Sequence, residues 1–212
     1  MMIIDYKNYG DITVEFQDEH KYTTNTTYQN FKRGSIINPY SRSIYGVGYI
    51  GEGQYKTHDG VKNIEPYITW KDMISRCYNK NQRHKHLAYA DCTVCDKWLN
   101  YQNFAQWYVN NYYDIGDGGR MHIDKDILIK ENKEYTPEKC LFVPQRINMI
   151  FMKKTKRVDA DLPTGIKRCV GGFNVTYNGK YQGVYKTLED ATDIYNAEKR
   201  IHILNVANEY KD

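Results

Sequence analysis

The stretch from Met121 to Phe151 holds residue types that can bind a divalent ion and cleave a phosphodiester bond. It contains one His, two Asp, two Asn and one Cys. Carboxylate and amide oxygens are ligands for hard cations, and an imidazole can accept a proton from water. The stretch is therefore a metal nuclease site, the remains of one, or a well-packed hairpin without chemistry.

The hydrophobic pattern of this stretch predicts a strand, a turn, a second strand and a helix. We expect the first strand at "IDKDILIK" (123–130) and the second at "KCLFVP" (139–144). Pro144 then permits a helix start at Gln145. Two amphipathic helices are predicted before it, because apolar residues recur there at helical spacing. These residues are Ile68, Met73, Ile74 and Cys77, then Trp98, Tyr101, Phe104 and Tyr108.

The chain as a whole indicates an α+β fold with three small modules. We expect a β-rich module over 1–65, a helix-containing ββα module over 66–156, and a sheet-and-helix module over 157–212. In the first, Ile12, Val14 and Phe16 alternate with polar residues, as in a half-buried strand. The Gly-rich stretch 45–55 fits a bent strand or a close backbone approach better than a phosphate-binding loop.

The last module has three short strands joined by Gly turns and one long helix. Thr187 is expected to cap the helix, with Asp190 at the third position of a capping box. Its expected apolar stripe is Ala191, Ile194, Tyr195, Ile201, Leu204 and Ala207.

Such a sheet has one free face, and strand alternation decides which residues occupy it. Phe173, Val175 and Tyr177 should point to the helix, and Asn174, Thr176, Asn178 and Lys167 away from it. Asn can read adenine, and Lys can read guanine or hold a phosphate. This face therefore suits a DNA groove.

The same segment resembles an AP2-type DNA-binding domain over about fifty residues. The matching residues are Gly165, Phe173, Gly183, Tyr185, Thr187, Ala191, Tyr195 and Ala197. The resemblance implies docking of the sheet in the major groove. The implied contacts are Lys167, Arg168, Asn174, Thr176, Asn178 and Tyr181. Several Arg and Trp base readers of the family are replaced here by smaller polar residues. The alternative is a module used for packing or protein contact.

The middle segment resembles HNH-type proteins of phages and mobile elements, which join a ββα-metal unit to an AP2-like domain. The match includes "WKDMISRCYN", "VCDKW" and "YTPEKCLFVPQRIN". It implies that Asp124 and Asn148 hold Mg²⁺ or another divalent cation. Where the family has His after the Asp, this chain has Lys125, which cannot serve as a base at neutral pH. His122, on the same strand face, is the candidate base, and Lys125 a candidate phosphate clamp.

The cysteines offer a second metal hypothesis. Cys77, Cys92, Cys95 and Cys140 could bind Zn²⁺, but they contain one close pair instead of two. We therefore expect small buried hydrophobic side chains, with zinc as the alternative. The odd count of five Cys argues against a disulfide framework.

Composition and charge agree with a nucleic-acid partner. Lys and Arg number 30 against 26 Asp and Glu. The "MKKTKR" run adds Lys153 and Lys154 as expected phosphate contacts. No signal pattern or membrane-length apolar run is present, so we expect a soluble cytoplasmic protein of a bacterial host cell, with no membrane partner.

These patterns predict a phage-type protein that binds double-stranded DNA, and one hypothesis makes it a divalent-metal-dependent HNH endonuclease. The alternatives are a catalytically degenerate DNA-binding regulator, or a protein-interaction factor, such as an inhibitor of host defence, built on the same scaffold. The sequence leaves the oligomeric state open.

Overall fold

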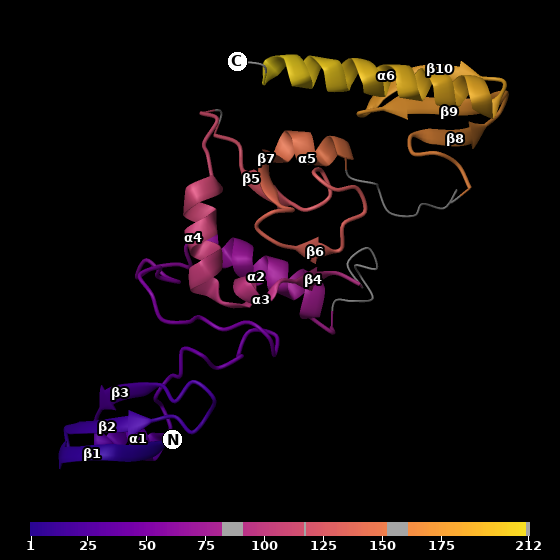
Figure 1. Cartoon of the computed structure of the whole chain (residues 1–212). Coiled ribbons are helices and arrows are strands. Elements are labelled where there is room, and N and C mark those ends of the chain that lie inside the picture. The colour runs from indigo at the N-terminus through magenta and orange to yellow at the C-terminus, as the bar shows by residue number, and fades with distance from the viewer. Residues whose placement is uncertain (82–90, 117, 152–160, 211–212) are drawn as a thin grey trace. The chain divides into compact units, whose positions relative to one another are not determined.

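A computed structural model of the chain describes residues 1–81, 91–116, 118–151 and 161–210 (Figure 1). The chain is an α+β protein of several small sheets and helices, as expected. It divides into two compact units, Met1–Val143 and Pro144–Asp212. The expected division into three modules remains a prediction. No helix of the described residues is long and apolar enough to cross a membrane.

The first unit begins with an antiparallel sheet in the order β1-β2-β3. Its strands are Met2–Asn8, Asp11–Glu15 and Thr23–Thr26. Ile12 and Val14 are buried, which confirms the half-buried strand. A short helix, α1 (Tyr28–Arg33), follows and is capped by the Thr27 side chain. The sequence pattern does not indicate α1, because the helix follows directly on a β-branched run that favours a strand.

The Gly-rich stretch 45–55 lies against the backbone and side chains of a distant segment. The Tyr49 amide donates to the Leu99 carbonyl at 2.9 Å, and the Tyr101 amide donates to the Tyr49 carbonyl at 2.9 Å. A Cβ atom at Gly51 would lie 2.4 Å from the Asn100 side-chain oxygen. Glycine is required at this position, and the expected close backbone approach is confirmed.

Three helices build the main core of the first unit: α2 (Glu65–Tyr78), α3 (Asp96–Leu99) and α4 (Tyr101–Asn111). Residues at the predicted helical spacing are buried, among them Met73, Trp98 and Phe104. The sequence predicts one helix across α3 and α4, and this is wrong. Asn100 separates the two, because its side chain accepts the Gln102 amide and caps α4.

The hairpin of the first unit is shorter than expected. β5 (Met121–Asp124) pairs with β7 (Leu141–Pro144), and β4 (Thr93–Val94) pairs in parallel with β6 (Glu134–Tyr135). We expected the first strand to continue to residue 130. It ends at Asp124 because the Asp124 carboxylate accepts the amides of Asp126 and Ile127 and turns the chain.

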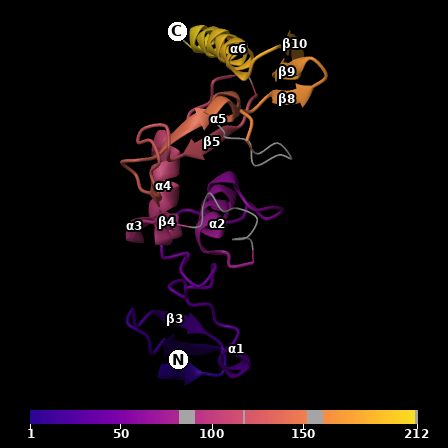
Figure 2. The same cartoon turned by 90° about the vertical axis from the view of Figure 1, so that its right-hand side faces the viewer.

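The second unit contains α5 (Gln145–Phe151), which begins directly after Pro144 as predicted. It also contains a three-stranded antiparallel sheet in the order β10-β9-β8, and helix α6 (Leu188–Glu209). The strands are β8 (Ile166–Cys169), β9 (Gly172–Tyr177) and β10 (Lys180–Tyr185). Helix α6 lies along one face of this sheet (Figures 1 and 2).

The start of α6 agrees with the prediction and its end does not. Thr187 Oγ1 accepts the Asp190 amide at 3.0 Å, and Ala191 is fully buried. Ile201, Leu204 and Ala207 were expected in the apolar stripe but are exposed. Helix α6 has 22 residues and spans about 33 Å. The longest strands of the sheet beneath it, β9 and β10, have 6 residues and span about 20 Å. The helix therefore extends past the sheet.

Candidate functional site

The face of the β8–β10 sheet opposite α6 forms the candidate nucleic-acid interface. Ile166 pairs with Val175, and both are buried with Ala191 of α6. Alternate residues must therefore point away from the helix. We call this surface the outer sheet face; it consists of Lys167, Cys169, Asn174, Thr176, Tyr181 and Val184.

The strand register arranges these residues in two rows. Lys167, Asn174 and Val184 are cross-strand neighbours and form a row across all three strands. Thr176 and Tyr181 form a second row across β9 and β10. The exposed fraction is 64% for Tyr181 and 44% for Val184, so the Tyr181 ring and the Val184 methyl groups are open to a ligand. The outer sheet face thus combines an ammonium group, an amide, hydroxyls and apolar surface.

The expected inward residues of β9 do face the helix. The Tyr177 ring packs edge-on against Tyr195 with centroids 5.3 Å apart. Its hydroxyl also forms a 2.9 Å hydrogen bond with His202 Nδ1. The partition of β9 into two faces is therefore confirmed.

Two of the expected DNA contacts do not lie on the outer sheet face. Arg168 pairs with Phe173 and so points to the helix side, because neighbouring strand residues face opposite ways. Its guanidinium pairs with Asp161 and, through hydrogen bonding, lowers the pKa of that carboxyl. Asn178 lies in the turn after β9, with a left-handed φ of 48°. The other four contacts named from β8, β9 and β10 share the outer face.

Val184 was missed by sequence reasoning. The register shifts between Tyr181 and Gly183, so that Gln182 is an extra residue in β10. Simple alternation from Tyr181 would turn Val184 toward the helix. The bulge reverses this and turns Val184 outward. The Gly183 preceding it, with φ 126°, was the local signal that could have indicated a bulge.

His122 and Asp124 lie on the same face of β5, as predicted. Their neighbours Met121 and Ile123 are buried in the core, whereas both polar residues are half-buried. Burial lowers the pKa of His122, and the positive charges of Arg120 and Arg76 lower it further. At neutral pH the His122 imidazole therefore favours its neutral form.

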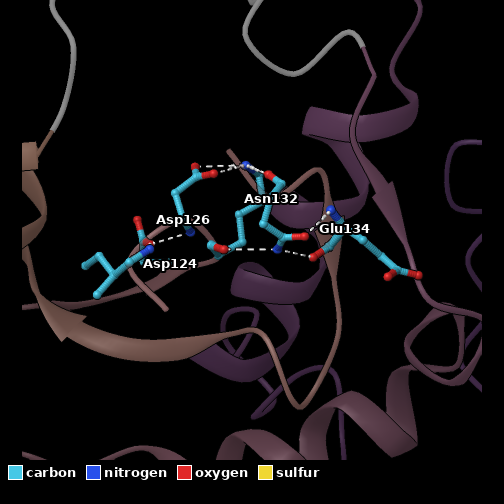
Figure 3. A network of polar contacts seen from close by, with 6 residues as sticks. Asp124, Asp126, Asn132 and Glu134 are labelled. Carbon is cyan, nitrogen blue, oxygen red and sulfur yellow. Dashed lines mark hydrogen bonds and ion pairs between the residues drawn. The ribbon is translucent and has the colours of Figure 1, made fainter. Parts of the chain in front are cut away.

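Figure 3 shows a network of polar contacts in the loop after β5, with Asp124, Asp126, Asn132 and Glu134 labelled. Lys125 belongs to this network. Its ammonium donates to the Asp126 carboxylate at 2.8 Å and to the Asn132 carbonyl at 2.6 Å. The Asn132 side chain in turn donates to the carbonyls of Lys125 and Glu134 at 3.0 and 2.7 Å. The Lys125 side chain is only 6% exposed. The expectation of an accessible phosphate clamp at Lys125 is therefore not supported, because its charge serves the loop that follows β5.

The expected metal ligands lie in different units. Asp124 belongs to the first unit and Asn148, on α5, to the second. The Asp124 carboxylate already accepts two backbone amides. Within the described ranges, no group of three or more His, Cys, Asp and Glu side chains is placed to hold a metal ion. The metal site at Asp124 and Asn148 stays a prediction. Lys153 and Lys154 lie outside the described residues.

The cysteine side chains are mostly inside the first unit. Cys77, Cys92 and Cys140 are buried, Cys95 is half-buried, and Cys169 on β8 is exposed. Burial raises the pKa of Cys77 and of Cys140 to about 12. The three buried side chains pack as the small hydrophobic groups that we expected.

Comparison with protein-family models, curated proteins and solved structures finds no match for this chain.

Proposed function

We propose that this chain binds double-stranded DNA through the outer sheet face. The single observation that carries the proposal is the row of Lys167, Asn174 and Val184 across three strands, on the side that α6 leaves open. Lys and Asn are the side chains that read purine edges and hold phosphates. An open surface with such groups favours contact with a nucleic acid, which presents both phosphates and base edges.

The dimensions of the row support a groove ligand. Neighbouring strands lie about 4.8 Å apart, so a row across three strands is about 10 Å wide. The major groove of DNA is about 12 Å wide and admits β-structure. Tyr181, which is 64% exposed beside this row, adds a ring that can pack on sugar or base.

Charge sets the expected strength of binding. The chain carries a formal net charge of +4, and the row itself holds one Lys. Each phosphate contacted contributes a slope of about −0.9 to the dependence of log affinity on log salt. We expect a measurable but shallow salt dependence, with much of the affinity from base and sugar contacts.

Fluorescence anisotropy with labelled duplexes over a salt series tests the proposal. Asn174→Ala should weaken binding at least fivefold, because an amide paired with a base contributes about 1–3 kcal/mol. The matched control is Asn205→Ala, an exposed Asn on α6, which should change affinity less than about twofold. Equal effects of the two variants, or no salt-sensitive binding to any duplex, would contradict the proposal and leave a protein partner as the better hypothesis.

DNA cleavage is the second candidate function, and its support is the shared strand face of His122 and Asp124. The test is nicking of supercoiled plasmid with Mg²⁺ or Mn²⁺, with EDTA as the control. In an HNH-type nuclease, His122→Ala and Asn148→Ala should each abolish metal-dependent nicking. DNA binding without nicking would assign the chain to the binding class.

A further inference from the structure

We propose that the outer sheet face prefers a sequence in which Val184 contacts the C5-methyl group of a thymine beside an adenine contacted by Asn174. This inference rests on the proposed function and deepens it, because it names the bases that the surface would select. Its starting point is the row Lys167–Asn174–Val184, in which an amide stands between an ammonium and an isopropyl group.

The outward position of Val184 needs an explanation. The side chain is 44% exposed on a face whose other members are Lys, Cys, Asn, Thr and Tyr. The bulge at Gln182 puts it there, and without the bulge it would point toward the helix. Leaving an apolar side chain in water costs free energy in proportion to its area. A ligand with a matching apolar group would bury that area.

The major groove offers one such group. Thymine carries a methyl there, and adenine in the same base pair presents the N6 donor and N7 acceptor that an Asn amide can pair with. Asn174 and Val184 are cross-strand neighbours, about 5 Å apart between β-carbons. Successive base pairs are separated by 3.4 Å along the duplex. The two side chains can therefore address one A·T pair or two adjacent pairs.

Lys167 extends this recognition to the other side of Asn174. It pairs with Asn174 across β8 and β9 and is exposed. A Lys in the groove donates to the O6 and N7 acceptors of guanine, or to a phosphate. The salt slope of a Lys167 variant separates these two partners, because only loss of a phosphate contact reduces it.

The first experiment enriches bound duplexes from a random library with the full chain and measures affinity for the enriched duplex. All thymines are then replaced by deoxyuridine, which lacks only the C5-methyl group. The wild-type chain should lose about fourfold in affinity, the value expected when burial of one methyl group is lost.

The second experiment repeats the exchange with two Val variants. Val184→Ala should bind the thymine duplex about fourfold or more weakly and should be insensitive to deoxyuridine, since the partner methyls are gone. Val170→Ala is the matched control, because Val170 lies in the turn between β8 and β9 and is fully exposed at 103%. It should keep both the affinity and the thymine sensitivity of the wild type.

The outcomes separate this inference from the proposed function. Salt-sensitive binding without enrichment of any sequence overturns the base preference and leaves DNA binding standing. The same holds if deoxyuridine has no effect on the wild type, or an equal effect on Val184→Ala. Absence of binding to every duplex overturns both. A thymine effect lost only in Val184→Ala supports the inference.

Discussion

The outer sheet face and the loop after β5 contain the same pair of residue types at the same sequence separation, Lys167 with Asn174 and Lys125 with Asn132. In the loop the two side chains bond each other's main chain, and Lys125 is 5% exposed. On the sheet the two are cross-strand neighbours on the side away from α6. One pair stabilises the fold, and the other is available to a ligand.

Residue type and spacing alone therefore do not determine the role of a Lys–Asn pair. A Lys near an Asp in a nuclease-like pattern suggested a phosphate contact, yet its charge is used within the loop (Figure 3). The role follows from whether water and ligands reach the group. Buried polar groups contribute to stability through their mutual bonds, whereas exposed ones contribute little until a partner arrives.

The largest expected effect comes from removing the buried charge. Lys125→Met should lower the free energy of unfolding by about 3 kcal/mol, because it leaves the Asn132 carbonyl without its donor in a buried site. Urea unfolding followed by Trp fluorescence measures this in the first unit. The control is Lys130→Met on the same loop, where the side chain is exposed and the change should stay under about 0.5 kcal/mol. Equal changes in the two variants would mean that the Lys125 contacts do not stabilise the loop.

Alkaline pH should weaken the first unit through its buried thiols. The folded-state pKa of Cys77 and of Cys140 is raised to about 12, and in the unfolded chain a thiol titrates near 8.5. The folded state therefore binds more protons between these values, and stability falls as pH rises through that window. At pH 10 each thiol should cost about 2 kcal/mol relative to pH 7.

Urea unfolding at pH 7 and pH 10 measures this fall. Cys77→Ala should reduce the fall, whereas Cys169→Ser, at an exposed site, should leave it unchanged. A free energy of unfolding that stays constant to pH 10 would mean that the two thiols are not shielded from water.

On the sheet, adjacent residues should differ in their effect on DNA binding. Lys167→Gln removes a cation from the outer sheet face and should weaken affinity about tenfold, within the usual range for a groove contact. Arg168→Gln removes a cation that points to the helix side and pairs with Asp161, so it should change affinity less than about threefold. Anisotropy titrations at one salt concentration compare them. A larger effect of Arg168→Gln would reverse our assignment of the two faces.

The smallest expected effect concerns Asp124. Its Oδ1 atom accepts the Asp126 and Ile127 amides at 2.7 and 2.8 Å. Asp124→Asn keeps an acceptor oxygen and should cost less than about 0.5 kcal/mol, whereas Asp124→Ala should cost about 1 kcal/mol. Urea unfolding distinguishes the two. If Asp124→Asn were as destabilising as Asp124→Ala, the negative charge of Asp124 would contribute more to stability than its two hydrogen bonds to the turn.

Local patterns predicted many elements correctly. The helical spacing of Met73 and Cys77, the Thr187 cap and the alternation of Phe173, Val175 and Tyr177 all appear in the structure as expected. Each depends on contacts within a few residues, or on a periodicity that places apolar groups on one side. Of the candidate site, this was enough to identify which residues of β9 face outward.

Longer-range contacts decided what the sequence alone could not. The bulge at Gln182 and the burial of Lys125 depend on segments that meet only in the folded chain. The main-chain carbonyl of Asn132 accepts a hydrogen bond from the Lys125 ammonium. The shift in register between β9 and β10 turns Val184 outward. Periodicity determined the helices, the strands and most of their faces. Tertiary structure decided which charged groups are enclosed and which remain exposed, because burial depends on neighbours distant in sequence.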